Sequence, residues 1–339
     1  MQMVKKKLGR QTVLFENPPS VAGYAAVVGK KEGNGPIGAY FDVVSEDTAF
    51  GEKTWEKAES RMQKDALGLA VNKAGVSLGA IEYIFAGDLL NQCVGTAFGL
   101  RDSSIPLFGL YGACSTMAEG LILSAMAIDG GFAGMAAALT SSHFCSSERQ
   151  YRLPLEYGGQ RTPCAQWTVT GSGAVILKSS GTGGVSITRA TTGKIVDLGI
   201  KDAANMGAAM APAARDTITA FFSDSGLMPS DIDLVVTGDL GVFGSEILLD
   251  LLKKDGFTLS SYADCGVMIF DPKTQDTHSG GSGCGCSASV LCGYLIPELE
   301  KGRYKSILFC GTGALLSPVT TQQGESIPGI CHAVLLEKR

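Results

Sequence analysis

The stretch Gly112-Ala113-Cys114-Ser115-Thr116 decides the fold of this chain. The apolar run 105–111 before it predicts a buried strand, and the Ala-, Leu- and Met-rich run 117–129 after it predicts a helix. Cys114 is therefore expected at a strand-to-helix elbow, where unpaired amide groups and the helix dipole favour negative charge. A thiol in that place can become a nucleophile, and the same amides can hold a ligand carboxylate. The alternative is a structural cysteine, because free cysteines are usually buried and this chain has ten.

The composition predicts a large core and limits the possible partners. The chain has 339 residues, 45% of them hydrophobic and only 18% charged. The net charge of -5, with Lys5-Lys6-Lys7 as the only basic block, argues against nucleic acid. No segment resembles a signal peptide or is long enough to span a bilayer, so we expect a soluble chain, at most peripheral to a membrane. The cysteines lack disulfide-framework and zinc spacing, which favours a reducing compartment and no metal site.

The second half of the chain repeats the first. The segment 232–240 matches 81–89 almost position for position, and both contain Gly-Asp-Leu. The segment 283–288 matches the elbow, with Cys286 opposite Cys114. These matches keep one order, which predicts an internal duplication with halves 1–180 and 181–339. Within the first half, residues 1–52 are expected to form an irregular N-terminal arm with loops, and an amphipathic helix is expected over 55–74.

Alternation of helix and strand in each half predicts the fold class. Each half should be an α/β unit with a central sheet covered by helices. Two such units should pack face to face around a pseudo-twofold axis, in layers α/β/α/β/α. The two elbow helices would then be buried between the sheets, and a pocket would form where strand ends meet.

This organisation resembles the thiolase superfamily, whose duplicated βαβαβαββ halves place a nucleophilic cysteine at the N-terminus of a buried helix. The resemblance covers about the whole chain. Six segments are also similar to the stage V sporulation protein AD family of endospore-forming bacteria: 86–92 (AGDLLNQ), 112–116 (GACST), 140–143 (TSSH), 156–160 (EYGGQ), 169–174 (VTGSGA) and 311–318 (GTGALLSP).

The family resemblance implies a biological role and partners. It implies binding of dipicolinic acid and its movement, with calcium, into the developing spore. It also implies partnership with the other SpoVA proteins, which are membrane proteins, and therefore a peripheral location at the forespore or spore inner membrane. Thiolase-like proteins commonly dimerise through strands near the elbow, so a homodimer is a further expectation.

The resemblance also allows the site chemistry to be compared. Condensing enzymes of the superfamily place His or Asn at two further positions, which fall here at about Gly238-Asp239 and Ser282. Without an imidazole, Cys114 would depend on the helix dipole, worth about 0.3–1 kcal/mol, which is under one pKa unit. His143 is the rival base, although a pocket-wall donor or a structural histidine is the preferred interpretation. The sequence thus favours binding over catalysis on this fold.

Dipicolinate is a flat pyridine ring with two carboxylates, which needs donors at both ends and an apolar slot. Asp88 is a candidate Ca²⁺ ligand; it could instead be protonated or cap the next turn, and capping is also the alternative for Asp239. One arginine of the polar stretch after His143 could pair with the ligand. The candidate ligand-binding residues are Asp88, Asn91, Cys114, Ser115, Thr116, Ser141, Ser142, His143, Asp239 and Ser282, with Arg149, Arg152, Gln160 and Arg161 nearby in the sequence.

Three functions remain open from the sequence. The first is a non-catalytic dipicolinate-binding protein that needs no cofactor, with Ca²⁺ present only as the dipicolinate chelate. The second is an acyl-CoA thiolase or condensing enzyme with Cys114 as nucleophile and an unusual base. The third is a scaffold that keeps the fold for assembly contacts alone.

Overall fold

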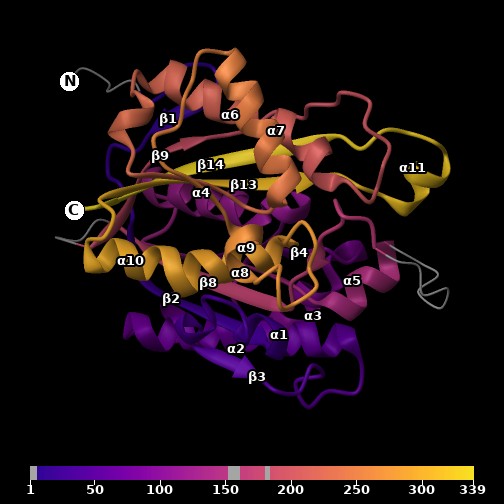
Figure 1. The fold of residues 1–339 in the computed structure, drawn as a ribbon. Coiled ribbons are helices and arrows are strands. Elements are labelled where there is room, and N and C mark those ends of the chain that lie inside the picture. The colour runs from indigo at the N-terminus through magenta and orange to yellow at the C-terminus, as the bar shows by residue number, and fades with distance from the viewer. Residues whose placement is uncertain (1–5, 152–160, 180–183) are drawn as a thin grey trace.

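The computed structural model describes residues 6–151, 161–179 and 184–339. Its elements form five layers, with two sheets separated and flanked by helices (Figure 1). The predicted α/β thiolase-like fold is confirmed. The predicted boundary between the halves, at residues 180 and 181, lies outside the described residues.

The two halves contain sheets of the same strand order. The first sheet runs β5(Leu107–Gly109), β4(Tyr83–Asp88), β6(Met135–Ser142), β8(Gly171–Lys178) and β2(Ser20–Gly29). The second runs β11(Tyr262–Asp264), β10(Leu234–Thr237), β13(Ser306–Ala314), β14(Gly329–Lys338) and β9(Val185–Thr191). In each sheet only the fourth strand, β8 or β14, is antiparallel to its neighbours. One residue pair between β2 and β9, Ser20 with Ser186, joins the sheets.

Helices cover both outer faces and fill the layer between the sheets (Figure 1). The outer helices are α2(Trp55–Ala74) and α3(Val94–Leu100) on the first sheet, and α6(Met206–Ser225) and α7(Gly241–Lys254) on the second. The inner helices are α4(Thr116–Asp129) and α9(Cys284–Val290), which continues through a π-helical turn, Leu291–Leu295, into α10(Ile296–Lys301). Shorter elements are β1(Thr12–Leu14), α1(Lys30–Gly33), β3(Val43–Ser45), α5(Phe144–Tyr151), β7(Trp167–Thr168), α8(Cys265–Ile269), β12(Gly281–Ser282) and α11(Pro318–Gln322).

Helix α4 is buried because it packs against β4 and β6 on one side and β13 and β14 on the other. Met117 and Leu121 are at most 1% exposed, and burial of such side chains stabilises the fold by about 1.5–3 kcal/mol each. The elbow before α4 lies against β13 at a glycine. A Cβ at Gly313 would lie 2.5 Å from the carbonyl oxygen of Gly112, so a larger residue would push the elbow away.

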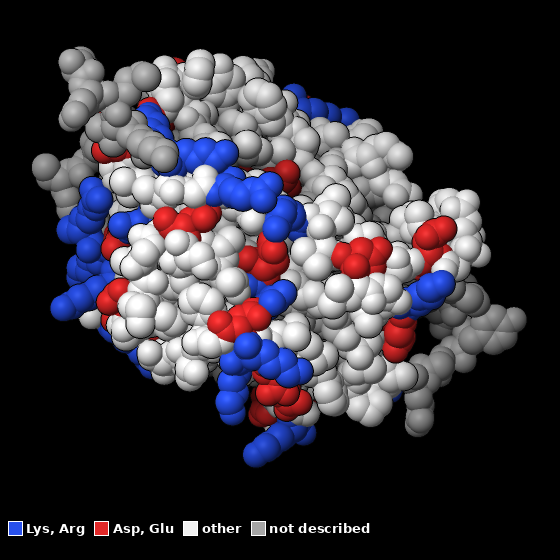
Figure 2. All heavy atoms as spheres, turned by 90° about the horizontal axis from the view of Figure 1, so that it is seen from above, with Lys and Arg blue, Asp and Glu red and all other residues white. Residues whose placement is uncertain are grey.

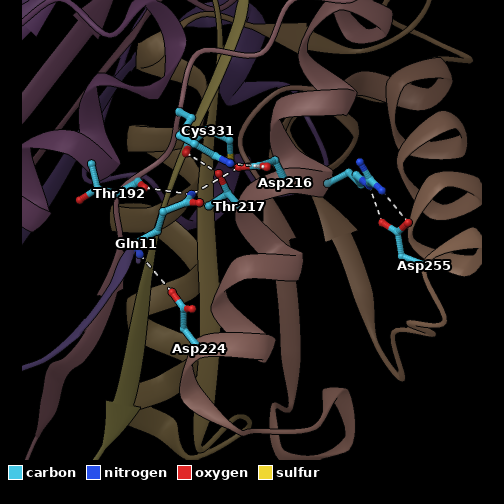
Figure 3. A network of polar contacts seen from close by, with 9 residues as sticks. Gln11, Thr192, Asp216, Thr217, Asp224, Asp255 and Cys331 are labelled. Carbon is cyan, nitrogen blue, oxygen red and sulfur yellow. Dashed lines mark hydrogen bonds and ion pairs between the residues drawn. The ribbon is translucent and has the colours of Figure 1, made fainter. Parts of the chain in front are cut away.

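The expectation for residues 1–52 is wrong, because these residues contain strands of the sheets. β2 is the strand of the first sheet that meets the second sheet, and its run of Ala and Val is buried there. β1 pairs with β9, so the N-terminal segment lies on the second half of the molecule. Figure 3 shows the contacts of Gln11 with that half. Its backbone amide donates to Asp224 Oδ2 (3.1 Å), and its side-chain Nε2 donates to the carbonyl of Thr192 (3.3 Å).

The strand expected over 105–111 is present but is not buried. β5 is the outermost strand of its sheet, and its side chains are exposed: Leu107 by 41% and Phe108 by 52%. An apolar run predicts a strand, but it does not distinguish an inner strand from an edge strand.

The correspondence between the two elbows differs from the prediction by two residues. Gly87 and Gly238 are equivalent glycines in the two halves. A Cβ at Gly87 would lie 2.9 Å from the side chain of Thr116, and the Cys286 thiol contacts the carbonyl of Gly238, so Thr116 and Cys286 occupy equivalent positions. Cys284, and not Cys286, is therefore the counterpart of Cys114. The residues just before them agree, since Ala113 (φ +49°) and Gly283 (φ +105°) both have positive φ.

Opposite charges alternate on the face that carries the outer helices of the second half. Figure 2, which views the molecule from above, shows Lys and Arg beside Asp and Glu on this face. Two of its ion pairs join Arg215 to Asp255 and Lys194 to Asp216, and Figure 3 labels the two acids. Exposed pairs of this kind contribute little stability, about 0–1 kcal/mol each.

Candidate functional site

A cavity lies between the two halves, beside the N-terminal elbow. Its volume of about 40 Å³ has room for about two or three water molecules. It is lined by Leu89, Tyr111, Ala113, Cys114, Ser147, Glu148, Tyr151, Thr168, Met206, Ser282, Ala314 and Leu316. An outer hollow of about 300 Å³ shares Tyr111, Tyr151 and Leu316 with the cavity and adds Asn91. The two spaces together form one recess with an inner and an outer part.

The thiol of Cys114 lies against a buried carboxylate. Asp239 is fully buried, and its side chain accepts hydrogen bonds from Thr312 Oγ1 (2.7 Å), the Gly283 amide (2.9 Å) and Ser282 Oγ (3.2 Å). The Cys114 thiol interacts electrostatically with this carboxylate. Burial raises the pKa of Asp239, and these donors oppose the rise. Burial raises the pKa of Cys114 well above its ordinary value, and the Asp239 carboxylate raises it further.

A second buried acid, Asp264, accepts the hydrogen bonds that would otherwise hold Asp239 in its own turn. The two amides that follow Asp239 donate to Asp264, Leu240 to Oδ2 (2.8 Å) and Gly241 to Oδ1 (3.0 Å). Because Asp264 accepts from these amides, Asp239 does not cap the turn that follows it. Capping of that turn was the alternative role predicted for Asp239. Its carboxylate instead connects residues of both halves, Cys114 from the first and Thr312 from the second.

The predicted hydroxyl donors of the elbow are used by the elbow itself. Ser115 Oγ donates to the carbonyl of Gly112 (2.7 Å), and Thr116 Oγ1 donates to the carbonyl of Ala113 (2.7 Å). The Ser115 amide also donates to Gly112 (3.0 Å). Neither Ser115 nor Thr116 lines the cavity. They hold the backbone that carries Cys114, and Ala113 keeps an uncommon positive φ there.

Asp88 caps the beginning of α3 and does not line the cavity. Its carboxylate accepts from the amides of Leu90 (2.8 Å) and Thr96 (2.7 Å) and from Thr96 Oγ1 (2.6 Å). This is the capping alternative of the sequence analysis, and it leaves no role for Asp88 as a calcium ligand in the cavity. Buried Glu59 lies nearby: burial, followed by the charge of Asp88, raises the pKa of Glu59 to about 8.

Ser141, Ser142 and His143 lie behind the cavity wall. Ser141 Oγ donates to Glu59 (3.0 Å), and Ser142 Oγ donates to the carbonyl of Val169 (2.7 Å). His143 Nε2 is 2.7 Å from the carbonyl oxygen of Thr48, and its ring stacks on Trp55. Burial lowers the pKa of His143. The sequence predicts that these three residues bind the ligand, but in the structure their side chains bond to Glu59, Val169 and Thr48 and do not line the cavity.

The other histidines and the arginines also lie away from Cys114. His278 is 3.4 Å from Asp276, and His332 accepts from the Gly193 amide (3.1 Å). Within the described ranges, none of the three histidines of the chain lines the cavity. Arg149 pairs with Glu56, and Arg161 pairs with Glu148 (3.5 Å), at the cavity wall. Arg152 and Gln160 lie outside the described residues.

Sequence reasoning missed the side of the cavity formed by α5 and Tyr111. Ser147, Glu148 and Tyr151 come from α5, and the hydroxyls of Tyr111 and Tyr151 are 2.6 Å apart. Tyr151 also donates to the carbonyl of Leu89. The only signal in the sequence is helical spacing: Ser147 and Tyr151 are four residues apart and so share one face of α5.

No cluster of three or more His, Cys, Asp or Glu side chains in the described part of the chain is arranged to hold a metal ion. Among the helices of residues 6–151, 161–179 and 184–339, none is both long and apolar enough to cross a membrane.

The sequence matches one protein family along nearly its whole length. A family model described as stage V sporulation protein AD (SpoVAD) matches residues 9–337. The chain is 44% identical over 334 residues to stage V sporulation protein AD of Bacillus subtilis (strain 168), and the match covers 98% of each protein.

Solved structures of other proteins share the fold of this chain. The chain is similar to OleA of Xanthomonas campestris, with a TM-score of 0.62 and 15% identity over 96% of this chain and 97% of that one. It is also similar to 3-oxoacyl-[acyl-carrier-protein] synthase III of Aquifex aeolicus VF5, with a TM-score of 0.57 and 14% identity over 94% and 99% of the two chains. At such low identity these similarities establish the fold alone.

Proposed function

Because the chain belongs to the stage V sporulation protein AD family, we propose that it is a non-catalytic binding protein for dipicolinic acid. Family membership gives it a role in sporulation. In the proposal, it binds pyridine-2,6-dicarboxylate and takes part in its uptake, with calcium, into the developing endospore. It does so as a component of the SpoVA group.

The contact between Cys114 and Asp239 carries the non-catalytic part of the proposal. A cysteine nucleophile reacts as the thiolate, which a nearby cation or imidazolium stabilises. Here the neighbour is a carboxylate, and both burial and Asp239 raise the pKa of Cys114. The thiol therefore stays protonated at neutral pH and serves as a wall of the cavity.

The shape of the recess supports a flat ligand with polar ends. The inner cavity is large enough for a carboxylate but too small for the whole acid. The pyridine ring would lie between the apolar side chains of Tyr111, Tyr151 and Leu316, which border both parts of the recess. The second carboxylate would reach the outer hollow, where the side-chain amide of Asn91 is a donor.

The charge of the recess supports calcium as a companion of the acid. Its lining, as far as the structure describes it, contains Glu148 but no Lys or Arg. Arg161 compensates Glu148 from behind the wall. A dianion gains little from such a surface, whereas its calcium chelate carries no net charge.

Titration calorimetry with the purified chain and dipicolinate, with and without Ca²⁺, tests the proposal. We expect binding of one ligand per chain and no turnover of acyl-CoA thioesters. Dipicolinate should also slow the alkylation of Cys114 by iodoacetamide, because Cys114 lines the inner cavity. Absence of heat under both conditions would refute the binding function.

The alternative function is that of an acyl-CoA thiolase or condensing enzyme, and the fold of the solved structures favours it. In that case Cys114 would react rapidly with iodoacetamide at neutral pH. Thioester turnover that disappears in the variant Cys114→Ala would establish the enzyme and remove the binding proposal.

The proposal extends to partners and location. The exposed apolar edge strand β5 is suited to a second copy of the chain, because an edge presents unpaired backbone groups. We place the protein peripherally at the forespore or spore inner membrane, beside the other SpoVA proteins. Sedimentation velocity tests the dimer, and copurification of SpoVA membrane proteins with the tagged chain tests the location.

A further inference from the structure

Ser147 carries a hydroxyl for which the described residues offer no hydrogen-bond partner. The residue is only 2% exposed, and it lines the inner cavity beside Cys114. A serine in a helix usually donates to the carbonyl four residues earlier, which is His143. That carbonyl already accepts from the Ser147 amide (3.1 Å) and from Ser146 Oγ (3.1 Å).

The other polar side chains that line the cavity are already engaged. Ser282 donates to Asp239 (3.2 Å), Thr168 donates to Glu148 (3.0 Å), and Tyr151 donates to Leu89. A buried hydroxyl without a partner is unfavourable, and native proteins usually satisfy it with water or ligand. In the described part of the chain, Ser147 is therefore the donor that the inner cavity keeps available for what enters it.

The size of the cavity indicates which group reaches Ser147. Space for about two or three water molecules corresponds to a single carboxylate, while the ring must extend toward the outer hollow. The thiol of Cys114 faces the Asp239 carboxylate and carries no positive charge, so it is a poorer partner for the ligand carboxylate than the Ser147 hydroxyl.

We propose that Ser147 is the inner anchor of the ligand and donates a hydrogen bond to one carboxylate oxygen. This inference rests on the proposed function, since it takes dipicolinate as the ligand. The inference assigns the carboxylate-binding hydroxyl to α5. The sequence had instead predicted this role for the hydroxyls of Ser115, Thr116, Ser141 and Ser142.

The variant Ser147→Ala tests the anchor, and Ser124→Ala is its matched control. Ser124 lies on α4, is fully buried and also has no partner for its hydroxyl among the described residues, but it does not line the cavity. Calorimetry with calcium dipicolinate should show a Kd about tenfold higher for Ser147→Ala than for the unaltered protein, the loss expected for one hydrogen bond to a charged group. Ser124→Ala should keep the original Kd.

Melting temperature without ligand separates recognition from folding. Ser147→Ala removes an unsatisfied buried hydroxyl, so its melting temperature should not fall, while the stabilisation by dipicolinate should shrink. An unchanged Kd in Ser147→Ala, or an equal loss in Ser124→Ala, would overturn the anchor and leave dipicolinate binding intact. Failure of the unaltered protein to bind dipicolinate would instead overturn the proposed function and the anchor with it.

Discussion

The two elbows of this molecule share one construction and have different environments. Cys114 and Cys284 each follow a residue with positive φ and stand at the start of an inner helix. Cys114 interacts with the Asp239 carboxylate and borders the cavity. Cys284 is fully buried, and its thiol donates to the carbonyl of Ser141 (2.9 Å). Duplication therefore produced two similar backbones but only one accessible site.

The acids at the ends of β4 and β10 differ in the same way. Asp88 caps the turn that follows it, whereas the turn that follows Asp239 is capped by Asp264. Asp239 can thus serve the opposite half of the molecule. Because Asp264 accepts from the amides that follow Asp239, the Asp239 carboxylate can accept from Gly283 and Thr312 instead.

The largest expected effect on the free energy of unfolding concerns the residues that precede Cys114 and Cys284, which are Ala113 and Gly283. Gly283→Ala should lower the free energy of unfolding by about 3 kcal/mol, because φ +105° is strained for alanine. Its Cβ would also lie 2.6 Å from Ser142 Oγ. Urea denaturation with tryptophan fluorescence measures the change.

Ala113→Gly is the converse substitution in the other elbow. It should stabilise the protein by about 0.5–1 kcal/mol, because glycine adopts positive φ without strain. If Gly283→Ala were as stable as the unaltered protein, the two elbows would not differ in backbone strain.

An intermediate effect concerns the pH dependence of the acid pair in the first half. The pKa of Glu59, raised to about 8 by burial and then by Asp88, means that folding favours the protonated carboxyl. Its contribution to stability is fully present below about pH 4.5 and is lost as the pH rises toward 8. Glu59→Gln should therefore remove most of the loss of stability that the unaltered protein shows between pH 5 and pH 8.

The acid pair of the second half provides the control. Burial raises the pKa of Asp264 to about 6, so Asp264→Asn should alter the pH dependence of unfolding mainly below pH 6. Urea titrations at several pH values compare the two variants. Equal slopes for Glu59→Gln and the unaltered protein would contradict the assignment of a neutral Glu59.

The smallest expected effect tests the contact that defines the site. Asp239→Asn removes the charge that raises the pKa of Cys114, and burial remains. Alkylation of Cys114 by iodoacetamide at pH 8 should accelerate, because a lower pKa of the thiol increases its thiolate fraction. Peptide mass spectrometry distinguishes Cys114 from the other cysteines.

Asp88→Asn is the matched control for that measurement, since Asp88 ends the equivalent strand and caps α3. It should leave the alkylation rate of Cys114 unchanged. A similar acceleration in both variants would mean that the two carboxylates act on Cys114 alike, contrary to the geometry.

Much of the fold could be predicted from local sequence. The helix expected over 55–74 matches α2, because a good N-cap, Thr54, and a left-handed Gly75 delimit it. The order of the repeated motifs predicted the duplicated architecture. The strands of residues 1–52 were missed, because β2 is stabilised by pairing with β8, which lies far away in the chain.

The candidate site could be predicted only in part. Of the ten candidate residues, Cys114 and Ser282 line the cavity and Asp239 contacts Cys114, whereas Asn91 borders the outer hollow. The remaining six are the residues whose side chains hold neighbouring backbone or buried polar groups: Asp88, Ser115, Thr116, Ser141, Ser142 and His143. A strand end places a residue near a pocket, but the direction of its side chain depends on sheet register.

Local sequence was sufficient to predict the duplicated α/β architecture and the position of Cys114 at a helix start, because turn residues and hydrophobic periodicity act over short distances. Only the tertiary structure decided that Cys114 meets Asp239 and that α5 supplies Ser147. These contacts join segments more than thirty residues apart, and they arise from the packing of two sheets on shared helices.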